Sequence, residues 1–514
     1  MAHDTARGPD MILDVRGYGA ACDGETDDTA SIQAAIDAVS TCGGGVVYLP
    51  PGTYRVSKTQ WQSYALRMRP HVKLMGAGAG ATVVQLVDDT PAIIAIIHAE
   101  AAHGMALQGL TFDGARYEVY QSDQMAAVRL VSTEGASVRD CGFRNPRGDG
   151  LLINGPASPT AHLSIENCEF DGAGRSGITL GSGHQHVTIR GCRFRGDFGS
   201  QPIDSEPAVP SITGGVLIDG CHIDCSGTPG GSILTCASVG YNRSDFRVVN
   251  NTFIDVCTHM GGTVGAVFTG NVFTVNQPLL YEVLRVAGAV DVDFHHNTVQ
   301  INVPQAKCGF VETTSLTSVP RDTDNVRITD NTFRGHGQIM VRNARRVIVR
   351  GNTVEAAEGA AYPEGIMLWA QSDVEVEAAS IADNDVAGYA RGMTIQSSAG
   401  YAFTGCRVTG NRFHDCGVGV WIGNTTFDFW RAGEFGGNIA TGTTPALLRE
   451  GSGTYLTSQP SAGQLPEIIT GRGTPEGSRA AAVGSLFLRI DGAAGSALYV
   501  KESGVGVYGW TAKT

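Results

Sequence analysis

A short element that recurs along most of the chain constrains the fold more than any other feature of the sequence. Its first copy reads VRDCGF and ends at Phe143, and its eleventh reads TGNRF and ends at Phe413. The third residue from the end is Cys in the first four copies and Asn in the other seven. These residues are Cys141, Cys168, Cys192, Cys221, Asn251, Asn271, Asn297, Asn331, Asn352, Asn384 and Asn411.

Successive copies are 20 to 34 residues apart, so the element is constant while the segments between copies vary in length. This pattern is typical of a solenoid whose coils share one size and carry loops of different length. It predicts an all-β fold, a right-handed single-stranded parallel β-helix of at least eleven coils. Stacking at ~4.8 Å per coil would place the Cys and Asn side chains in one column. Asn amides can hydrogen-bond along such a column, and Cys side chains can fill it.

Each coil carries a second strand upstream of this element. Examples are GLLIN (150–154), GITLG (177–181) and GIMLW (365–369). Alternate residues of these strands are apolar, and the residues between them must face outward. Stacked strands of this kind form one long sheet whose outer face is open to a ligand.

Charge and composition exclude several classes of protein. The formal charge of −13 argues against a nucleic-acid partner or an anionic membrane surface, because either needs a basic face. An acidic glycan remains possible, since a local basic groove can lie on an acidic protein. We expect no membrane span and no Sec signal peptide, because the chain has no run of about 18 apolar residues and no apolar segment in residues 1–10. Twelve dispersed cysteines without CxxC pairs or an HExxH motif predict neither a disulfide scaffold nor a metal site.

The first sixty residues carry a recognisable pattern. DVRGYGA (14–20) and DGETDDT (23–29) precede an amphipathic helix expected over 30–39, and GGGVVYLPPGTY follows at 43–54. This pattern resembles the N-terminal cap of the pectate-lyase-like β-helix superfamily, which includes glycosidases, lyases, epimerases and phage tailspikes. In such a cap the helix closes the open end of the solenoid and prevents edge-to-edge growth.

The C-terminal residues suggest a further resemblance. VGSLFLRIDG (483–492) and ALYVKESG (497–504) resemble a small β module found at the ends of phage tail proteins. Together the two resemblances point to a phage tailspike or related polysaccharide depolymerase. They imply a polysaccharide partner, a homotrimer, and a virion-associated or extracellular location. We divide the chain into an N-terminal cap (1–60), a β-helix (61–448), a Gly/Ser/Thr/Pro-rich linker (449–479) and the small module (480–514).

One coil places acidic residues where its neighbours have neutral ones. In the strand PIDSEP (202–207), Asp204 and Glu206 share the outward face ~6.6 Å apart along the strand. Two carboxylates at this range are typical of glycosidases, where one acts as general acid and the other as base, and their proximity raises one pKa. A solvated strand face and a Ca²⁺ ligand pair are the alternatives. We therefore predict Asp204 and Glu206 as the catalytic pair.

Residues of neighbouring coils are candidates for binding the glycan. Arg175 and Arg243 could hold a substrate carboxylate, and Trp369 and Trp421 could stack on sugar rings if they are exposed. Glu312 lies about four coils, or ~19 Å, beyond Asp204 and suits a distant subsite. The full set of predicted substrate-binding residues is Asp149, Arg175, His184, Tyr241, Arg243, Glu312, Arg342, Trp369 and Trp421.

The sequence favours hydrolysis over the reactions of uronates. Superfamily epimerases carry an Asp-Pro-His strand, which is absent here, and lyases pair calcium-binding carboxylates with an Arg base. No Arg lies beside Asp204 on its own strand, and two carboxylates without a positioned His or Arg favour a glycoside hydrolase acting within the chain of a bacterial surface or extracellular glycan. We expect such an enzyme to use no cofactor, whereas a lyase could use Ca²⁺. A lyase or epimerase, and a non-catalytic glycan-binding spike or adhesin, remain the alternatives.

Overall fold

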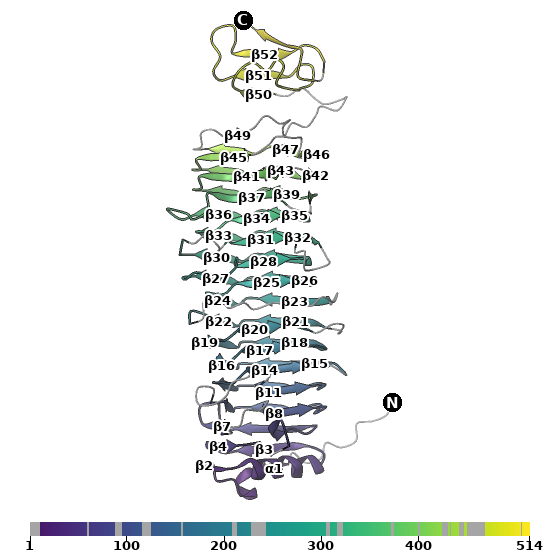
Figure 1. Ribbon diagram of the computed structural model, residues 1–514, viewed down its shortest axis with the longest axis vertical. Coiled ribbons are helices and arrows are strands. Elements are labelled where there is room, and N and C mark those ends of the chain that lie inside the picture. The colour runs from purple at the N-terminus through teal and green to yellow at the C-terminus, as the bar shows by residue number, and fades with distance from the viewer. Residues whose placement is uncertain are drawn as a thin grey trace.

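The chain forms a long stack of coils, each wound from short parallel strands (Figure 1). The computed structural model describes residues 11–513 apart from 59–60, 88–94, 116–124, 156–157, 208–212, 228–242, 305–308, 316–321, 372–374, 399–400, 424–429, 432, 442–446, 450–467 and 505. The predicted parallel β-helix is confirmed. Within the described residues, no helix combines the length and the apolar character that crossing a membrane requires.

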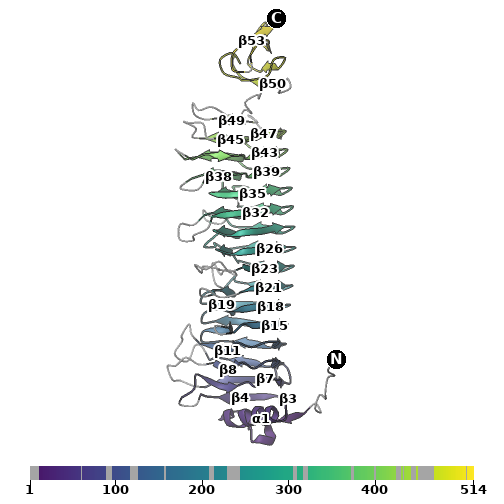
Figure 2. The same cartoon turned by 90° about the vertical axis from the view of Figure 1, so that its right-hand side faces the viewer.

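Two faces of the solenoid are continuous sheets. One is a 19-stranded sheet that includes β1 (Ile12–Asp14) and β47 (Glu434–Gly436). The other has 16 strands, from β2 (Asp23–Asp27) to β48 (Ile439–Thr441), with one strand from each coil. The second view shows the coils stacked along the long axis, with their strands running across it (Figure 2).

The third face carries the outward positions singled out from the sequence, and its described strands form two sheets. The six-stranded sheet comprises β5 (Tyr64–Arg67), β8 (Ala95–Glu100), β11 (Ala126–Val131), β14 (Asp149–Asn154), β17 (Ile178–Leu180) and β20 (Ile203–Ser205). The eight-stranded sheet comprises β25 (Thr258–Gly261), β28 (Leu284–Ala287), β31 (Val311–Thr314), β34 (Ile339–Arg342), β37 (Glu364–Ala370), β41 (Arg391–Ser397), β45 (Val418–Gly423) and β49 (Leu447–Arg449).

The repeated element forms the turn between the first two faces, and its backbone explains its sequence. The residue before each Cys or Asn has a positive φ, as in Asp140 (52°), Gly191 (60°) and Gly270 (67°). Gly adopts this left-handed conformation freely, and Asp and Asn tolerate it better than other residues do. The requirement accounts for the DC, NC, GC, GN and DN pairs of the repeat.

The Asn side chains form a continuous hydrogen-bonded ladder along the inside of this turn. Asn271 Nδ2 donates to Asn297 Oδ1 at 2.9 Å, and Asn297 Nδ2 donates to Asn331 Oδ1 at 3.1 Å. The same oxygens accept from backbone N–H groups of the preceding coil, and each Nδ2 also reaches a strand carbonyl, such as that of Val248. Asn438 adds a rung that the sequence comparison missed, because the element around it ends in Ala440 and has no Phe or Val there.

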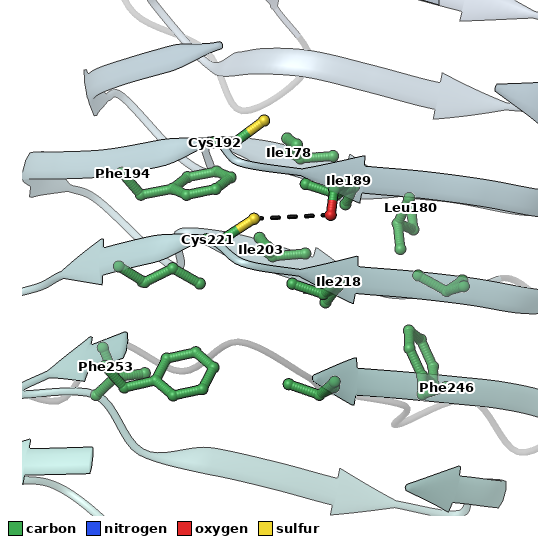
Figure 3. Packing of buried hydrophobic residues seen from close by; sticks show 14 of the residues in the cluster. Ile178, Leu180, Ile189, Cys192, Phe194, Ile203, Ile218, Cys221, Phe246 and Phe253 are labelled. Carbon is green, nitrogen blue, oxygen red and sulfur yellow. Dashed lines mark hydrogen bonds between the residues drawn. The ribbon is translucent and has the colours of Figure 1, made fainter. Parts of the chain in front are cut away.

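The four cysteines occupy the same column nearer the N-terminus. Cys221 Sγ donates to the carbonyl of Ile189 at 3.6 Å, the contact drawn in Figure 3. All four are buried and carry a free thiol, which agrees with the prediction that they fill space. Beside them, rings one coil apart stack in the core, with centroids 4.6 Å apart between Phe170 and Phe194. The column and the core are therefore built from identical positions repeated coil after coil.

Both ends of the chain differ from the solenoid. The predicted cap helix is α1 (Thr29–Thr41), which buries Ile32, Ile36 and Val39 at the N-terminal end of the stack. At the other end, β50 (Ile468–Gly471), β51 (Leu486–Arg489), β52 (Leu498–Lys501) and β53 (Trp510–Lys513) form a sheet with a core of its own. β50 lies within residues 449–479, so the prediction that this whole segment is a linker is wrong. β50 has only four residues, and this is too short an alternation of apolar and polar residues to be recognised in a segment rich in Gly and Thr.

The ladder predicts the cost of removing one rung. Asn297→Ala deletes an acceptor shared by the backbone N–H and the side-chain amide of Asn271, and it frees the carbonyl of Phe268. Several buried polar groups would lose their partners, so we expect a loss of about 3 kcal/mol of stability. Cys192→Ala is the matched control in the same column and should cost about 1 kcal/mol, because a thiol is a weak donor. Thermal melting of both variants tests this, and equal melting temperatures would contradict a special role for the Asn rungs.

Candidate functional site

The predicted catalytic pair lies at β20, where the described part of the six-stranded sheet ends. Parallel pairing sets Asp204 level with Thr179 of β17. Ile203 and Ser205 are buried and face the core, so the residues that alternate with them project outward. Asp204 is nevertheless only 4% exposed, whereas the Glu206 side chain is 48% exposed.

One arginine joins this pair to a third carboxylate. Arg175 lies just before β17, and its Nη2 contacts Asp204 Oδ2 at 3.5 Å and also Glu206 Oε1. Its Nη1 donates to Asp149 Oδ2 at 3.2 Å and to the Thr179 hydroxyl at 3.3 Å. Asp149, Arg175 and the Asp204–Glu206 pair come from three successive coils. We call these four charged residues the Arg175 cluster.

Asp149 holds the most unusual carboxyl group of the cluster. It is the first residue of β14 and is fully buried. Burial raises its pKa to about 7, although the charge of Arg175 and an N–H bond from Ser176 at 3.1 Å oppose the rise. For Arg175, burial opposes the charged form, but Asp149, Glu206 and Asp204 outweigh it and raise its pKa. The cluster therefore keeps a proton on Asp149 up to neutral pH and an ionised guanidinium beside it.

The contacts of Arg175 overturn one argument made from the sequence. Hydrolysis was favoured there because no Arg or His was positioned beside Asp204. Arg175 comes from the preceding coil, 29 residues earlier, and contacts both Asp204 and Glu206. Stacking at the coil spacing brings distant residues level with one another, so inspection of the strand alone could not exclude such a partner.

Other predicted binding residues lie apart from the cluster or outside the described residues. His184 begins β18 (His184–Arg190) on the 19-stranded sheet, where its Nδ1 lies 2.6 Å from the carbonyl of Gly181 and burial lowers its pKa. No contact between His184 and the Arg175 cluster is present among the described residues. Tyr241 falls in residues 228–242, outside the description. Arg243 begins β23 (Arg243–Val249), and its side chain is likewise outside it.

The remaining candidates lie on the eight-stranded sheet. Glu312 of β31 contacts Arg342 of β34, and the Arg342 guanidinium lies 6.0 Å from the ring of Trp369 on β37. Trp421 of β45 is 8% exposed, with the Arg391 guanidinium 4.0 Å from its ring. The exposed face that the sequence argument required of Trp421 is therefore covered by an arginine.

The carboxylates of the Arg175 cluster are arranged around a guanidinium. Throughout the described segments, no group of three or more His, Cys, Asp and Glu side chains is arranged to hold a metal ion. The cluster has three carboxyl groups against one cation, so its net charge is negative and becomes more negative when Asp149 ionises. Such a site can hold and transfer protons, and it repels an anionic group placed directly on it.

Comparison with known families agrees with the fold. The family described as right handed beta helix region matches residues 126–302 and 307–430, more than half of the chain. A family described as rhamnogalacturonase A/epimerase, pectate lyase-like, matches residues 12–209.

Known proteins resemble parts of this chain in sequence or in fold. A mannuronan C5-epimerase of Azotobacter vinelandii is 44% identical over 145 residues, and alginate lyase 7 of the same organism is 46% identical over 109 residues. These alignments cover 25% and 20% of this chain but 14% and 13% of the two relatives, so the chain spans about a seventh of their length. The tailspike protein of Escherichia coli bacteriophage HK620, solved with a pentasaccharide, has a TM-score of 0.52 and 11% identity over 84% of this chain and 78% of that one. At this identity the likeness shows the fold alone.

The raised pKa of Asp149 predicts a pH dependence of stability. A carboxyl with a pKa of about 7 in the folded chain and ~3.9 in the unfolded chain stabilises the fold below pH ~4 and loses that contribution as the pH rises to about 7. We expect the stability of the wild type, relative to Asp149→Asn, to fall by a few kcal/mol between pH 4 and pH 7.5.

The measurement is thermal or denaturant unfolding of both proteins across this range. Asp219→Asn is the matched control, because Asp219 ends β21 (Gly214–Asp219) on another face and pairs with Arg190 at 3.0 Å. A constant difference between wild type and Asp149→Asn at all pH values would show that burial does not raise the Asp149 pKa.

Proposed function

Because the chain belongs to the right-handed β-helix family, we propose that it is a polysaccharide-acting enzyme and that its third face is the glycan groove. The Arg175 cluster is the proposed reaction centre, and glycoside hydrolysis is the proposed reaction. The observation that carries the proposal is the combination of a carboxyl with a pKa of about 7 at Asp149 and a partly exposed carboxylate at Glu206, both bound to one arginine.

Each residue of the cluster has a distinct proposed role. Glu206 is the most exposed carboxylate and meets the sugar, with Asp204 beside it as the second member of the catalytic pair. Arg175 holds the two carboxylates on one side of the strand through Nη2, and Asp149 is a positioning residue that fixes Nη1. Asp149 stays protonated up to neutral pH, so one of the three carboxyl groups around Arg175 adds no negative charge beside the pair. A protonated carboxyl is what the leaving oxygen of a glycosidic bond needs.

The charge of the cluster favours hydrolysis over uronate chemistry at this centre. A lyase or epimerase must neutralise the carboxylate of the sugar it attacks, and Arg175, the described cation of the cluster, already contacts three protein carboxylates. A sugar without a carboxylate therefore fits this position better than a uronate does.

A uronate lyase or epimerase is the second candidate. The likeness to a mannuronan C5-epimerase and an alginate lyase, each above 40% identity over the matched segment, favours it. In that case a substrate carboxylate would displace one protein carboxylate from Arg175. The two reactions differ in their products, because elimination leaves an unsaturated sugar that absorbs in the near ultraviolet.

The proposal extends to the setting of the protein. The likeness of the fold to a phage tailspike supports a virion-associated or extracellular homotrimer that cleaves within a bacterial surface or extracellular glycan. Mass measurement in solution tests the trimer directly.

The decisive experiment removes the carboxylate pair. The wild type, the double variant Asp204→Asn/Glu206→Gln and the control Glu169→Gln are incubated with a panel of neutral and acidic bacterial polysaccharides. Glu169 lies on β16 (Glu169–Ala173), another face, where it pairs with Arg195 at 2.6 Å. We expect new reducing ends without near-ultraviolet absorbance from the wild type and the control, and a loss of at least about 10²-fold in the double variant.

Two results would contradict this assignment. Full cleavage by the double variant would remove the pair from the mechanism, and an absorbing product would replace hydrolysis by elimination. Binding of a panel glycan without any cleavage by the wild type would support a non-catalytic spike.

A further inference from the structure

A second group of charged side chains lies on the same face, beyond the Arg175 cluster. It occupies β25, β28, β31 and β34 and the turn before β28. We call it the Glu312 cluster, and its members are His259, Tyr281, Glu282, Arg285, Glu312 and Arg342. Of these, only Glu312 and Arg342 attracted notice in the sequence. The others carry no motif, and Tyr281 and Glu282 lie in a turn whose orientation a strand pattern does not predict.

Stacking sets three of these residues in one outward column. Parallel pairing places His259 level with Arg285, and Arg285 level with Glu312. The residues on either side of Arg285, Leu284 and Val286, are buried in the core, so the column faces outward. The geometry comes from three successive coils and needs no long loop.

Two arginines share the carboxyl group of Glu312 in this cluster. Arg285 Nε lies 3.6 Å from Glu312 Oε2, and Arg342 Nη2 contacts Glu312 Oε1. Glu312 is 5% exposed, whereas both arginine side chains are partly open to solvent. The Nε atoms of both arginines are buried without a hydrogen-bond partner among the described residues. One carboxylate therefore faces two guanidinium groups whose hydrogen-bonding capacity is not used up.

The other ionisable groups do not supply the missing negative charge below pH 7. Burial, together with the neighbouring charge of Glu312, raises the pKa of Glu282 to about 7, and its Oε2 is buried without a hydrogen-bond partner. Burial and the charge of Arg285 lower the pKa of His259 to about 4, so its ring is neutral. The charged groups that act on Glu282 are Glu312 and Arg285, and Glu282 in turn acts on Cys257, whose pKa burial raises to about 12. With Glu282 and His259 uncharged, two guanidinium groups face the one carboxylate of Glu312, and the cluster carries one net positive charge at pH 6.

We propose that the Glu312 cluster is a subsite for the carboxylate of an acidic sugar, held by Arg285 and Arg342. The Tyr281 ring, 5.1 Å from the Arg285 guanidinium and partly exposed, offers a face on which the same sugar can rest. The proposal rests on the proposed function, because it treats the third face as the glycan groove. It adds the substrate class, an acidic heteropolysaccharide.

The two clusters of the groove have opposite charge. The Arg175 cluster is negative and suits a sugar without a carboxylate, whereas the Glu312 cluster is positive and suits a sugar with one. β31 lies four coils beyond β20, or ~19 Å along the groove. The substrate would then present its acidic sugar at this distance from the bond that is cleaved.

Ionisation of Glu282 should weaken the binding of an anionic ligand at this subsite. As the pH rises above about 7, Glu282 gains a charge, and the net charge of the cluster falls from one to zero. An anionic ligand should therefore bind about tenfold more weakly at pH 8.5 than at pH 6. Glu282→Gln cannot ionise, so this variant should keep the tight binding at both pH values.

The test is calorimetric titration with oligosaccharides of defined charge. Hexamers of polygalacturonate, polymannuronate and hyaluronate are the anionic probes, and cellohexaose is the neutral probe. We expect at least one anionic probe to bind the wild type more tightly at pH 6 than at pH 8.5, Glu282→Gln to abolish the difference, and Arg342→Gln to weaken binding at pH 6 at least about fivefold. Arg334→Gln is the matched control, because Arg334 pairs with Glu355 at 2.6 Å on another face.

The outcomes separate this proposal from the preceding one. Binding that survives in Asp204→Asn/Glu206→Gln but is lost in Arg342→Gln supports the subsite whether or not the Arg175 cluster is catalytic. No binding of any anionic probe, equal loss in Arg334→Gln and Arg342→Gln, or an unchanged pH dependence in Glu282→Gln would each overturn it, provided that the variants melt within a few degrees of the wild type.

Discussion

The hydrogen bonds that join one coil to the next determine everything else in this protein. Each strand pairs in parallel with the strand one coil away, and the Asn ladder repeats the same register on the inside of the turn. A single side chain there satisfies a backbone N–H, a carbonyl and another amide, so the register cannot slip without exposing several buried polar groups. The loops of a coil can vary in length because the turn that carries its Cys or Asn residue keeps the register constant.

This constant register turns separation in sequence into proximity in space. Asp149, Arg175 and Asp204 lie 26 and 29 residues apart, yet the guanidinium of Arg175 contacts both carboxylates. The Glu312 cluster is assembled in the same way from the coils of β25 to β34. In each cluster burial then shifts the pKa of one carboxyl to near neutrality, which a solvated strand face would not do.

The fold was predictable to the level of single side chains because the repeated element is local. The Cys and Asn positions, the outward orientation of Asp204 and the cap helix could all be predicted from short stretches of sequence. The contacts of Arg175 could not, because they depend on the length of the intervening loop and on where the chain re-enters the sheet. The raised pKa of Asp149 could not be foreseen either, since it depends on how completely the neighbouring coils bury this side chain. Glu282 was missed because it belongs to a turn, where no alternation marks its direction.

The regular spacing of the coils has a consequence for how such a protein can diversify. The two charged clusters are separated by a whole number of coils, and each is built from neighbours within its own coils. A chain that gained or lost one complete coil between β20 and β25 would keep both clusters intact and change their separation by ~4.8 Å. Duplication or deletion of the segment that encodes one coil would then change the repeat length of the glycan that fits. The residues of both clusters would stay the same. The distance between the two clusters along the groove can therefore change in steps of one coil.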